Sequence, residues 1–429
     1  MLKSELQPQS TEEKIVWMTL VSSYFLYLSG TLYAVAALVG WALFFVSSLR
    51  WIVFGVSPEK ACFPITIWIW VIGMVAMLIA LLMAHTEYSL SIGQTIKSTI
   101  GWAKGWALLA LFPLLGAIVN IRPELLVRAC CILSSQSVPF ALVGILIVVI
   151  GFQGHLFTSP LSVVGGPIST FEVGLFGINP ETGKPRWSFF APWAPAAGLL
   201  SCLLLIICSH ENNNFWRRSG KVGALVMCLL CQSRAGWALF ILLIPAMSTF
   251  KYLKQPGVLI FLGLFFTSIV ILSQPVMEHV NQVHQDIKDA RPGSTRVRTA
   301  LATIALQRWE SEAPIWGHGI VERGPKMVEF MPIGSHHSWY GLLFVKGLVG
   351  LLALAIPMLI TVMYLLSQAM RFRGAQSALL IMLVLIGYSF FENLEILAYL
   401  YWPALLWIGM ALNPLKQTLF EYESKGVFV

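Results

Sequence analysis

Charged residues are scarce in this sequence. They make up 11% of its 429 residues, whereas 57% are hydrophobic, and the mean hydropathy is +0.76. Soluble domains carry about 25% charged residues, so the composition excludes a soluble globular fold. It predicts an all-α integral membrane protein that crosses the bilayer many times.

The signals of metal, disulfide and nucleic-acid chemistry are also missing. The seven cysteines lie within or at the edge of apolar stretches, and none has the spacing of a zinc site in a polar loop. The net charge of +8 does not indicate nucleic acid, because the basic residues mostly lie in short segments between apolar runs. We therefore expect no disulfide scaffold, no metal, no cofactor and no nucleic-acid partner.

Long uncharged runs follow one another along most of the chain. No residue between Lys14 and Arg50 is charged, and one helix of that length would rise roughly 52 Å against a hydrocarbon core of about 30 Å. We expect two spans that turn near Gly30, the first of them retained because the polar N-terminus shows no cleavage site. Ten further runs bring the count to about twelve transmembrane helices, at residues 64–84, 103–121, 130–152, 191–209, 222–232, 235–249, 256–273, 339–367, 375–391 and 395–412.

Basic residues set the expected orientation of these spans. With both termini in the cytoplasm, almost every inner loop carries at least two lysines or arginines, most clearly in the runs FWRRSGK and RFR. Two long loops, at residues 153–190 and 274–338, then lie on the outer face. The second contains charges of both signs, but long translocated loops are largely exempt from the rule. Residues 1–429 are thus expected to form one polytopic membrane domain.

Arg234 interrupts an apolar stretch at about residues 222–249, in CQSRAGWALF. A guanidinium within one membrane helix would cost at least ~2.5 kcal/mol, and two short helices that turn at Arg234 remove most of that cost. The arginine then either fixes the turn by snorkelling or forms an anion site that faces a lipid-embedded ligand. The anion site is favoured, because intramembrane ionisable groups are functional candidates by default.

A charged amphipathic segment lies in the second outer loop. Residues 295–309 have helical periodicity, with one apolar face formed by Val297, Leu301, Ile304 and Ala305. Gly293 and Ser294 precede it as turn and N-cap candidates, which places Arg296 and Arg298 in the first turn. Either arginine could bind phosphate together with free backbone N–H groups, or could be an ordinary surface charge. A solvated role is favoured for two others, Arg291 and Arg308.

Two adjacent histidines, His336 and His337, precede the apolar run that begins near Trp339. A histidine there stays hydrated enough to titrate near neutral pH, yet it borders a membrane pocket that could desolvate a substrate. The residues alone leave open a functional role and that of an interfacial anchor. A third histidine, His318, lies between two glycines in PIWGHGI, where a tight turn is favoured over catalysis.

The stretch SHHSWYGLLFVKGLVGLL at residues 335–352 resembles the SHNxxLxLLxxxGxxGLL signature of the O-antigen ligase and O-antigen polymerase superfamily. These are polytopic glycosyltransferases that use polyprenyl-pyrophosphate-linked glycans. Other family features occur in the same order: an SRxxW-like span break at 233–237, an arginine-bearing helix in a long outer loop, a PxxGxG turn at 314–319, and the closing stretch FFENLEILAYLYWPALLWIGMAL at 390–412. The resemblance is specific over the core at residues 217–412 and general, by hydropathy, before it.

The resemblance implies a C-type membrane glycosyltransferase fold with a large helical outer loop. It puts the essential histidine on His336, the span-break arginine on Arg234, and the loop arginine on Arg298 or Arg296. The family usually has Asn where this sequence has a second histidine, so that residue is expected to orient or hydrogen-bond. His336 would take the proton of an acceptor hydroxyl in an inverting, metal-independent displacement while arginines bind pyrophosphate. Auxiliary roles are expected for His337 and Arg291.

Two activities share this scaffold. A polymerase adds a lipid-linked glycan to a lipid-linked repeat or growing chain, and a ligase transfers the finished chain to lipid A-core. GSHxxxxxLLxxKGxxG looks more like the polymerases of capsular polysaccharide and exopolysaccharide. A secondary transporter or lipid-glycan flippase is the alternative from another class, but the unusual charges gather at the outer face instead of the midplane.

The same resemblance implies the partners and the location of the protein. The expected partners are a polyprenyl-pyrophosphate-linked glycan donor, a glycan or lipid-linked acceptor, the lipid bilayer, and other polysaccharide assembly proteins. The expected location is the bacterial inner membrane, with both termini cytoplasmic and the active site on the periplasmic face.

Overall fold

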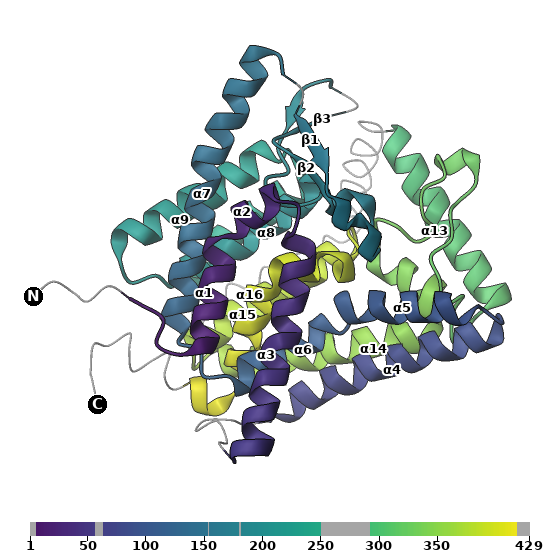
Figure 1. Ribbon diagram of the computed structural model, residues 1–429, viewed down its shortest axis with the longest axis horizontal. Helices are drawn as coiled ribbons and strands as arrows, with labels where there is room; N and C mark the ends of the chain where they lie inside the picture. The colour runs from purple at the N-terminus through teal and green to yellow at the C-terminus, as the bar shows by residue number, and fades with distance from the viewer. Residues whose placement is uncertain (1–5, 56–62, 153, 180–181, 250–291, 418–429) are drawn as a thin grey trace, which may run out of the picture.

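The structure is a computed structural model, and it describes residues 6–55, 63–152, 154–179, 182–249 and 292–417. This described part is mostly helical, with two small two-stranded sheets (Figure 1). It contains five helices long and apolar enough to cross a membrane, or six if the bent pair α5 (Ile92–Lys104) and α6 (Leu108–Ile118) forms one span. The five are α3 (Leu32–Phe54), α4 (Ile65–Glu87), α7 (Pro123–Ile150), α14 (Ser338–Ala369) and α16 (Leu394–Leu412). An all-α membrane protein is confirmed.

Shorter helices occupy the other predicted apolar runs in the described part. They are α1 (Thr11–Val21), α2 (Ser23–Leu28), α8 (Ala194–Cys208), α9 (Asn214–Leu230), α10 (Arg234–Thr249) and α15 (Arg373–Ser389). The chain turns at Gly30, between α2 and α3, where the sequence predicts a turn. The run at 256–273 lies outside the described residues, so the count of about twelve spans and the C-type fold stay predictions.

The outer loop expected at residues 153–190 contains β-structure that hydropathy did not reveal. Strand β1 (His155–Thr158) pairs antiparallel with β2 (Glu172–Gly174), and β3 (Gly177–Ile178) pairs antiparallel with β4 (Pro185–Arg186). Short 3-10 turns lie at Pro160–Val164 and Ile168–Thr170. Strands of two to four residues are too short for the alternation of apolar and polar residues that predicts a strand.

Segments expected on one side of the membrane contact one another. The loop at 153–190 forms hydrogen bonds with other segments predicted to lie on the outer side. They include bonds from Tyr27 Oη to the Gly174 carbonyl (2.8 Å), from Lys104 Nζ to the Gly165 carbonyl (2.6 Å), and from Arg186 Nε to the Cys231 carbonyl (2.7 Å). Ion pairs join segments expected on the inner side, Arg122 with Glu13 (2.8 Å) and Arg128 with Glu211 (2.8 Å). A chain that crosses the bilayer repeatedly brings alternate loops to the same side, and this explains the two sets of contacts. The assignment of one side as periplasmic stays a prediction.

Helix α16 lies at the centre of the bundle, among α3, α6, α14 and α15 (Figure 1). In the most apolar stretch of this helix, 89% of the residues are buried. A Cβ on Gly409 would lie 2.0 Å from the Pro113 carbonyl oxygen of α6, so only glycine allows this approach. Small residues at such positions let membrane helices pack backbone to backbone. This packing holds the C-terminal part of α16 against α6.

Helix α14 is broken at Gly347, where φ is +60° and ψ is −160°. The PxxGxG turn lies alongside the break and forms backbone hydrogen bonds with it, from His318 N to the Phe344 carbonyl (2.8 Å), from Gly319 N to the Val345 carbonyl (3.0 Å) and from Leu348 N to the Pro314 carbonyl (2.9 Å). The sequence predicts one continuous span here. The structure shows instead that the turn replaces helical hydrogen bonds, which holds this part of the outer loop against α14.

Candidate functional site

His336 and His337 form the entry to α14. His336 has a φ of +63°, in the left-handed region that residues with a side chain rarely adopt. His337 is the N-cap of α14, where its Nδ1 accepts a hydrogen bond from the Tyr340 N–H at 3.4 Å. The His337 ring also stacks on Tyr340, with ring centroids 3.9 Å apart. The start of the helix therefore fixes where both half-buried imidazoles lie.

The turn between α15 and α16 holds this histidine segment in place. Ser338 Oγ donates to the Glu392 carbonyl oxygen at 2.7 Å and accepts from the Leu394 N–H at 3.0 Å. Trp339 Nε1 donates to Ser389 Oγ at 2.8 Å. Segments about 55 residues apart in the sequence are thus joined by hydrogen bonds at the site.

Arg298 approaches the histidines from α13 (Pro292–Glu312). The apolar face predicted for this helix is found: Val297 and Leu301 pack against Val328. Burial, followed by the charge of Arg298, lowers the pKa of His336 and of His337 to about 4. Arg298 is therefore close enough for its charge to act on both imidazoles, and both are neutral at pH 7.

Arg296, the alternative loop arginine, is directed elsewhere. Its side chain is exposed, and its guanidinium donates to the Met327 carbonyl oxygen at 3.2 Å. The helix begins at Pro292, earlier than the sequence predicts, because proline suits the first helical position. Free N–H groups belong to the first four residues, so the expected anion site in the first turn includes neither Arg296 nor Arg298. Arg291 lies outside the described residues.

A buried carboxyl group completes the cluster. Glu392 is 2% exposed in the turn between α15 and α16, and its Oε2 accepts a hydrogen bond from Trp193 Nε1 at 2.7 Å. Burial raises the pKa of Glu392 to about 7, while the Arg298 charge, the Trp193 hydrogen bond and the Arg186 charge act to lower it. Sequence reasoning missed Glu392 and Arg186. The available signal for Glu392 was an acidic residue between two apolar runs, in the stretch FFENLE that also contains Glu395.

Arg234 is the first residue of α10, so the predicted break of the apolar stretch is found. It follows a tight turn in which Gln232 has a φ of +48°. Arg186 binds the Cys231 carbonyl at this turn and also acts electrostatically on Glu392, so the turn borders the cluster. Arg234 itself is exposed, and within the described part of the chain its guanidinium forms no hydrogen bond or ion pair.

His318 belongs to a separate network that holds the PxxGxG turn. Its Nδ1 lies 3.0 Å from the Phe344 carbonyl oxygen and its Nε2 lies 2.8 Å from the Glu312 carboxylate. Arg308, expected to be solvated, instead pairs with Glu312 at 2.8 Å and with Glu322 at 2.6 Å. The bonds from Arg308 and then His318 lower the pKa of Glu312 to about 2. These contacts agree with a turn role for His318.

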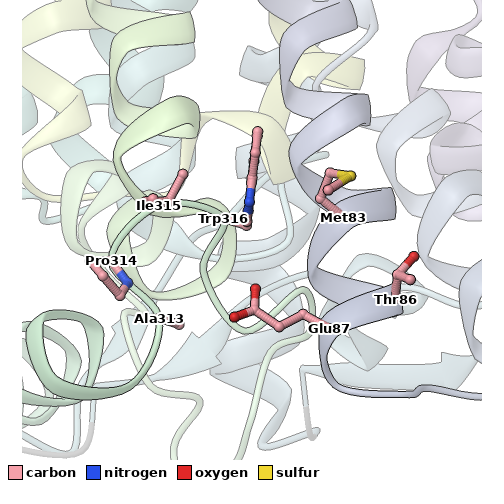
Figure 2. A pocket seen from close by; sticks show the side chains of 7 residues that line it. All are labelled: Met83, Thr86, Glu87, Ala313, Pro314, Ile315 and Trp316. Carbon is pink, nitrogen blue, oxygen red and sulfur yellow. The ribbon is translucent and has the colours of Figure 1, made fainter.

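A mostly apolar cavity of about 420 Å³ lies at the end of α4 (Figure 2). Figure 2 shows Met83 and Trp316 between α4 and the PxxGxG turn, with Glu87 extending from α4 toward Ala313. The cavity is lined by Met83, Thr86, Glu87, Ala313, Pro314, Ile315 and Trp316. None of these residues belongs to the histidine cluster.

No metal-ligand group was found among the described residues, meaning three or more His, Cys, Asp or Glu that could hold an ion. The six cysteines in that part are buried and form no disulfide. The seventh, Cys62, lies outside the described residues. A metal-independent reaction without a cofactor stays a prediction.

Residues 220–355 match the model of a family described as O-antigen ligase. A search of curated proteins finds no match. The matched segment contains Arg234, Arg298 and the two histidines, whereas Arg186 and Glu392 lie outside it. Residues 220–355 are thus similar to an O-antigen ligase domain, and this match supports the predicted resemblance to the O-antigen ligase and polymerase superfamily.

Proposed function

We propose that this membrane protein transfers a glycan from a polyprenyl-pyrophosphate donor to a sugar hydroxyl at the outer face of the bacterial inner membrane. The family supports a glycosyltransferase of O-antigen ligase or polymerase type. The observation that carries the finer proposal is that the charge of Arg298 acts on both His336 and Glu392, whose segments are joined by the hydrogen bond from Ser338 to the Glu392 carbonyl oxygen. Such a cluster combines an anion-binding group with a proton acceptor.

Arg298 is the proposed ligand of the pyrophosphate. A guanidinium presents a fixed fork of donors that matches phosphate oxygens, and it is more weakly hydrated than an ammonium group. Arg234, with its exposed guanidinium at the neighbouring α9–α10 turn, is proposed as the second ligand. As the bond between sugar and phosphate breaks, negative charge grows on the leaving pyrophosphate, and fixed positive charges stabilise it.

His336 is the proposed general base. Its imidazole is neutral at pH 7, because its pKa is about 4, so a ring nitrogen has a free lone pair. The acceptor oxygen attacks the anomeric carbon, the bond from that carbon to the phosphate oxygen breaks, the electron pair leaves with pyrophosphate, and His336 takes the hydroxyl proton. A bound pyrophosphate would offset the charge of Arg298, raise the pKa of His336 and make it a stronger base.

Three variants test these roles by glycan transfer in isolated membranes. His336→Ala should lower transfer by about 10²-fold or more, the usual contribution of a general base. Arg298→Ala should also lower it strongly, whereas the matched control Arg296→Ala should transfer near the wild-type rate. Wild-type transfer by the His336 variant would remove the proposed base, and equal losses at both arginines would remove the distinction between them.

We propose a polymerase and keep a ligase as the second candidate, because the sequence around His336 favours the former. Deletion of the gene followed by analysis of surface glycan separates them. Single repeats without long chains indicate a polymerase, whereas free lipid-linked polymer indicates a ligase. Unchanged surface glycan would count against both.

A further inference from the structure

The hairpin of β3 and β4 forms hydrogen bonds with the turn between α9 and α10. Helix α9 ends at Leu230, so the carbonyl groups from this residue onward have no partner within the helix. Donors from the hairpin pair with three of them in succession. Trp187 N donates to the Leu230 carbonyl oxygen at 3.2 Å, Arg186 Nε donates to that of Cys231 at 2.7 Å, and Arg186 Nη2 donates to that of Gln232 at 3.3 Å. One guanidinium group therefore spans two neighbouring carbonyl groups of the turn.

The turn also donates to the hairpin. Gln232 Nε2 donates to the Pro185 carbonyl oxygen at 3.0 Å, so hydrogen bonds run in both directions between the two segments. The backbone of Gln232 has a φ of +48°, in the left-handed region, and such a residue keeps this conformation only where its surroundings hold it. The hairpin supplies such surroundings, and it therefore fixes the path of the chain into α10.

The first turn of α10 is fixed by contacts of its own. Ser233 Oγ accepts a hydrogen bond from the Gly236 N–H at 3.2 Å, which is the geometry of a helix N-cap. Trp237 Nε1 donates back to the Cys228 carbonyl oxygen of α9 at 2.7 Å. Arg234 is the first residue of α10, so its backbone lies between a turn bound by the hairpin and a capped helix. Its exposed guanidinium group is thus attached to a backbone whose position is fixed.

We propose that Arg186 is a positioning residue, which binds the carbonyl groups of the α9–α10 turn and thereby places Arg234 where its guanidinium group can pair with the pyrophosphate of the donor. This inference rests on the proposed function, in which Arg234 is the second pyrophosphate ligand, and deepens it. An arginine suits this task because its planar fork carries donors in a fixed geometry. The hairpin lies outside the segment at 220–355 that matches the O-antigen ligase family, so it adds to the site a part that the family match does not cover.

Binding of farnesyl pyrophosphate to the detergent-purified full chain, measured by calorimetry, tests this role. Arg234→Ala should weaken binding about 10- to 100-fold, the usual cost of a lost hydrogen bond to a charged group. Arg186→Ala should weaken it by about tenfold, because a misplaced guanidinium group keeps only part of that hydrogen bond. Farnesol lacks the pyrophosphate, so its binding should be the same in every variant.

A double-mutant cycle separates positioning from direct binding. In the Arg234→Ala background, Arg186→Ala should cause no further loss, because no guanidinium group remains to be placed. If Arg186 itself bound the anion, the two losses would add. The matched control is Lys184→Ala, which removes a positive charge from the same hairpin. The Lys184 side chain is exposed and forms no hydrogen bond or ion pair within the described part of the chain, so this variant should bind as wild type.

Gln232→Asn is a second test, and it changes no charge. Asparagine tolerates the left-handed region but is one methylene shorter, so it should lose the hydrogen bond to the Pro185 carbonyl. The turn should then be held less firmly. Binding of farnesyl pyrophosphate should weaken in this variant, and only while Arg234 is present.

The outcomes separate this inference from the proposed function. Additive losses in the cycle, or an Arg186→Ala variant that binds as wild type, would overturn positioning by Arg186 while pyrophosphate binding by Arg234 and Arg298 still stands. Wild-type binding by Arg234→Ala would instead remove Arg234 as a pyrophosphate ligand. If Arg186→Ala does not fold, as judged by its melting temperature, Gln232→Asn decides, and unchanged binding in that variant refutes the proposal.

Discussion

His337 should have two separable roles, because it caps α14 through Nδ1 and stacks on Tyr340. An N-cap contributes about 0.5–2 kcal/mol, and the 3.4 Å length of this hydrogen bond places it toward the lower end. A stacked ring pair contributes about 0.5–1.5 kcal/mol. His337→Ala loses both and should destabilise the fold by about 1–2.5 kcal/mol.

Two further substitutions at this position divide that loss. His337→Asn restores a good capping side chain without the ring, and His337→Phe keeps the ring without a capping acceptor. Each should be less destabilising than His337→Ala, as measured by the unfolding midpoint of the detergent-purified protein. The asparagine variant also restores the residue that the superfamily signature has here. An asparagine variant no more stable than alanine would refute the capping role.

Two other predictions follow from glycine geometry and from histidine protonation. Gly347→Ala should destabilise the protein by more than about 1 kcal/mol, because φ is +60° and the new Cβ would lie 2.3 Å from the Ile315 carbonyl oxygen. The matched control is Gly93→Ala in α5, where a new Cβ meets nothing within 4 Å, and it should stabilise the protein by about 0.5–1 kcal/mol. Equal shifts of the melting temperature in the two variants would contradict the break of α14 at Gly347. In pH profiles, the acid limb of kcat/KM should lie near pH 4, because His336 acts as a base when neutral. Replacing Arg298 with Gln removes a charge that lowers the pKa of His336, so the acid limb should move to higher pH. An acid limb that does not move would show that the charge of Arg298 does not act on His336.

The membrane fold was predicted well wherever a long apolar run gives a local hydropathy signal. The apolar runs correspond to helices in the described part, and the turns near Gly30 and Arg234 are found because a bilayer limits the length of a span. The break of α14 at Gly347 was not predicted. It depends on the PxxGxG turn, which supplies backbone partners from about 30 residues earlier in the chain, and hydropathy carries no information on such partners.

The candidate site was predicted only in part for a similar reason. His336 and Arg234 stand out as polar residues at the ends of apolar runs. Glu392 lies in the closing stretch at 390–412, but the sequence assigned it no role, because its significance comes from Trp193, Arg186 and Arg298, which lie on distant segments. The small sheets that place Arg186 are too short to predict. Tertiary packing, and not local pattern, assembled these residues.

The choice between Arg296 and Arg298 shows what local geometry can and cannot decide. Successive residues in a helix are rotated by about 100° around its axis, so side chains two positions apart lie roughly 200° apart and cannot both face one ligand. Val297, between them, is buried at 5% exposure, so the arginines flank the packed face of α13 on opposite sides. Helix geometry therefore predicts that only one of the two arginines faces a bound phosphate. Which arginine faces the histidines depends on how α13 packs. In the structure, Arg296 donates to the Met327 carbonyl oxygen, whereas the charge of Arg298 acts on the two histidines.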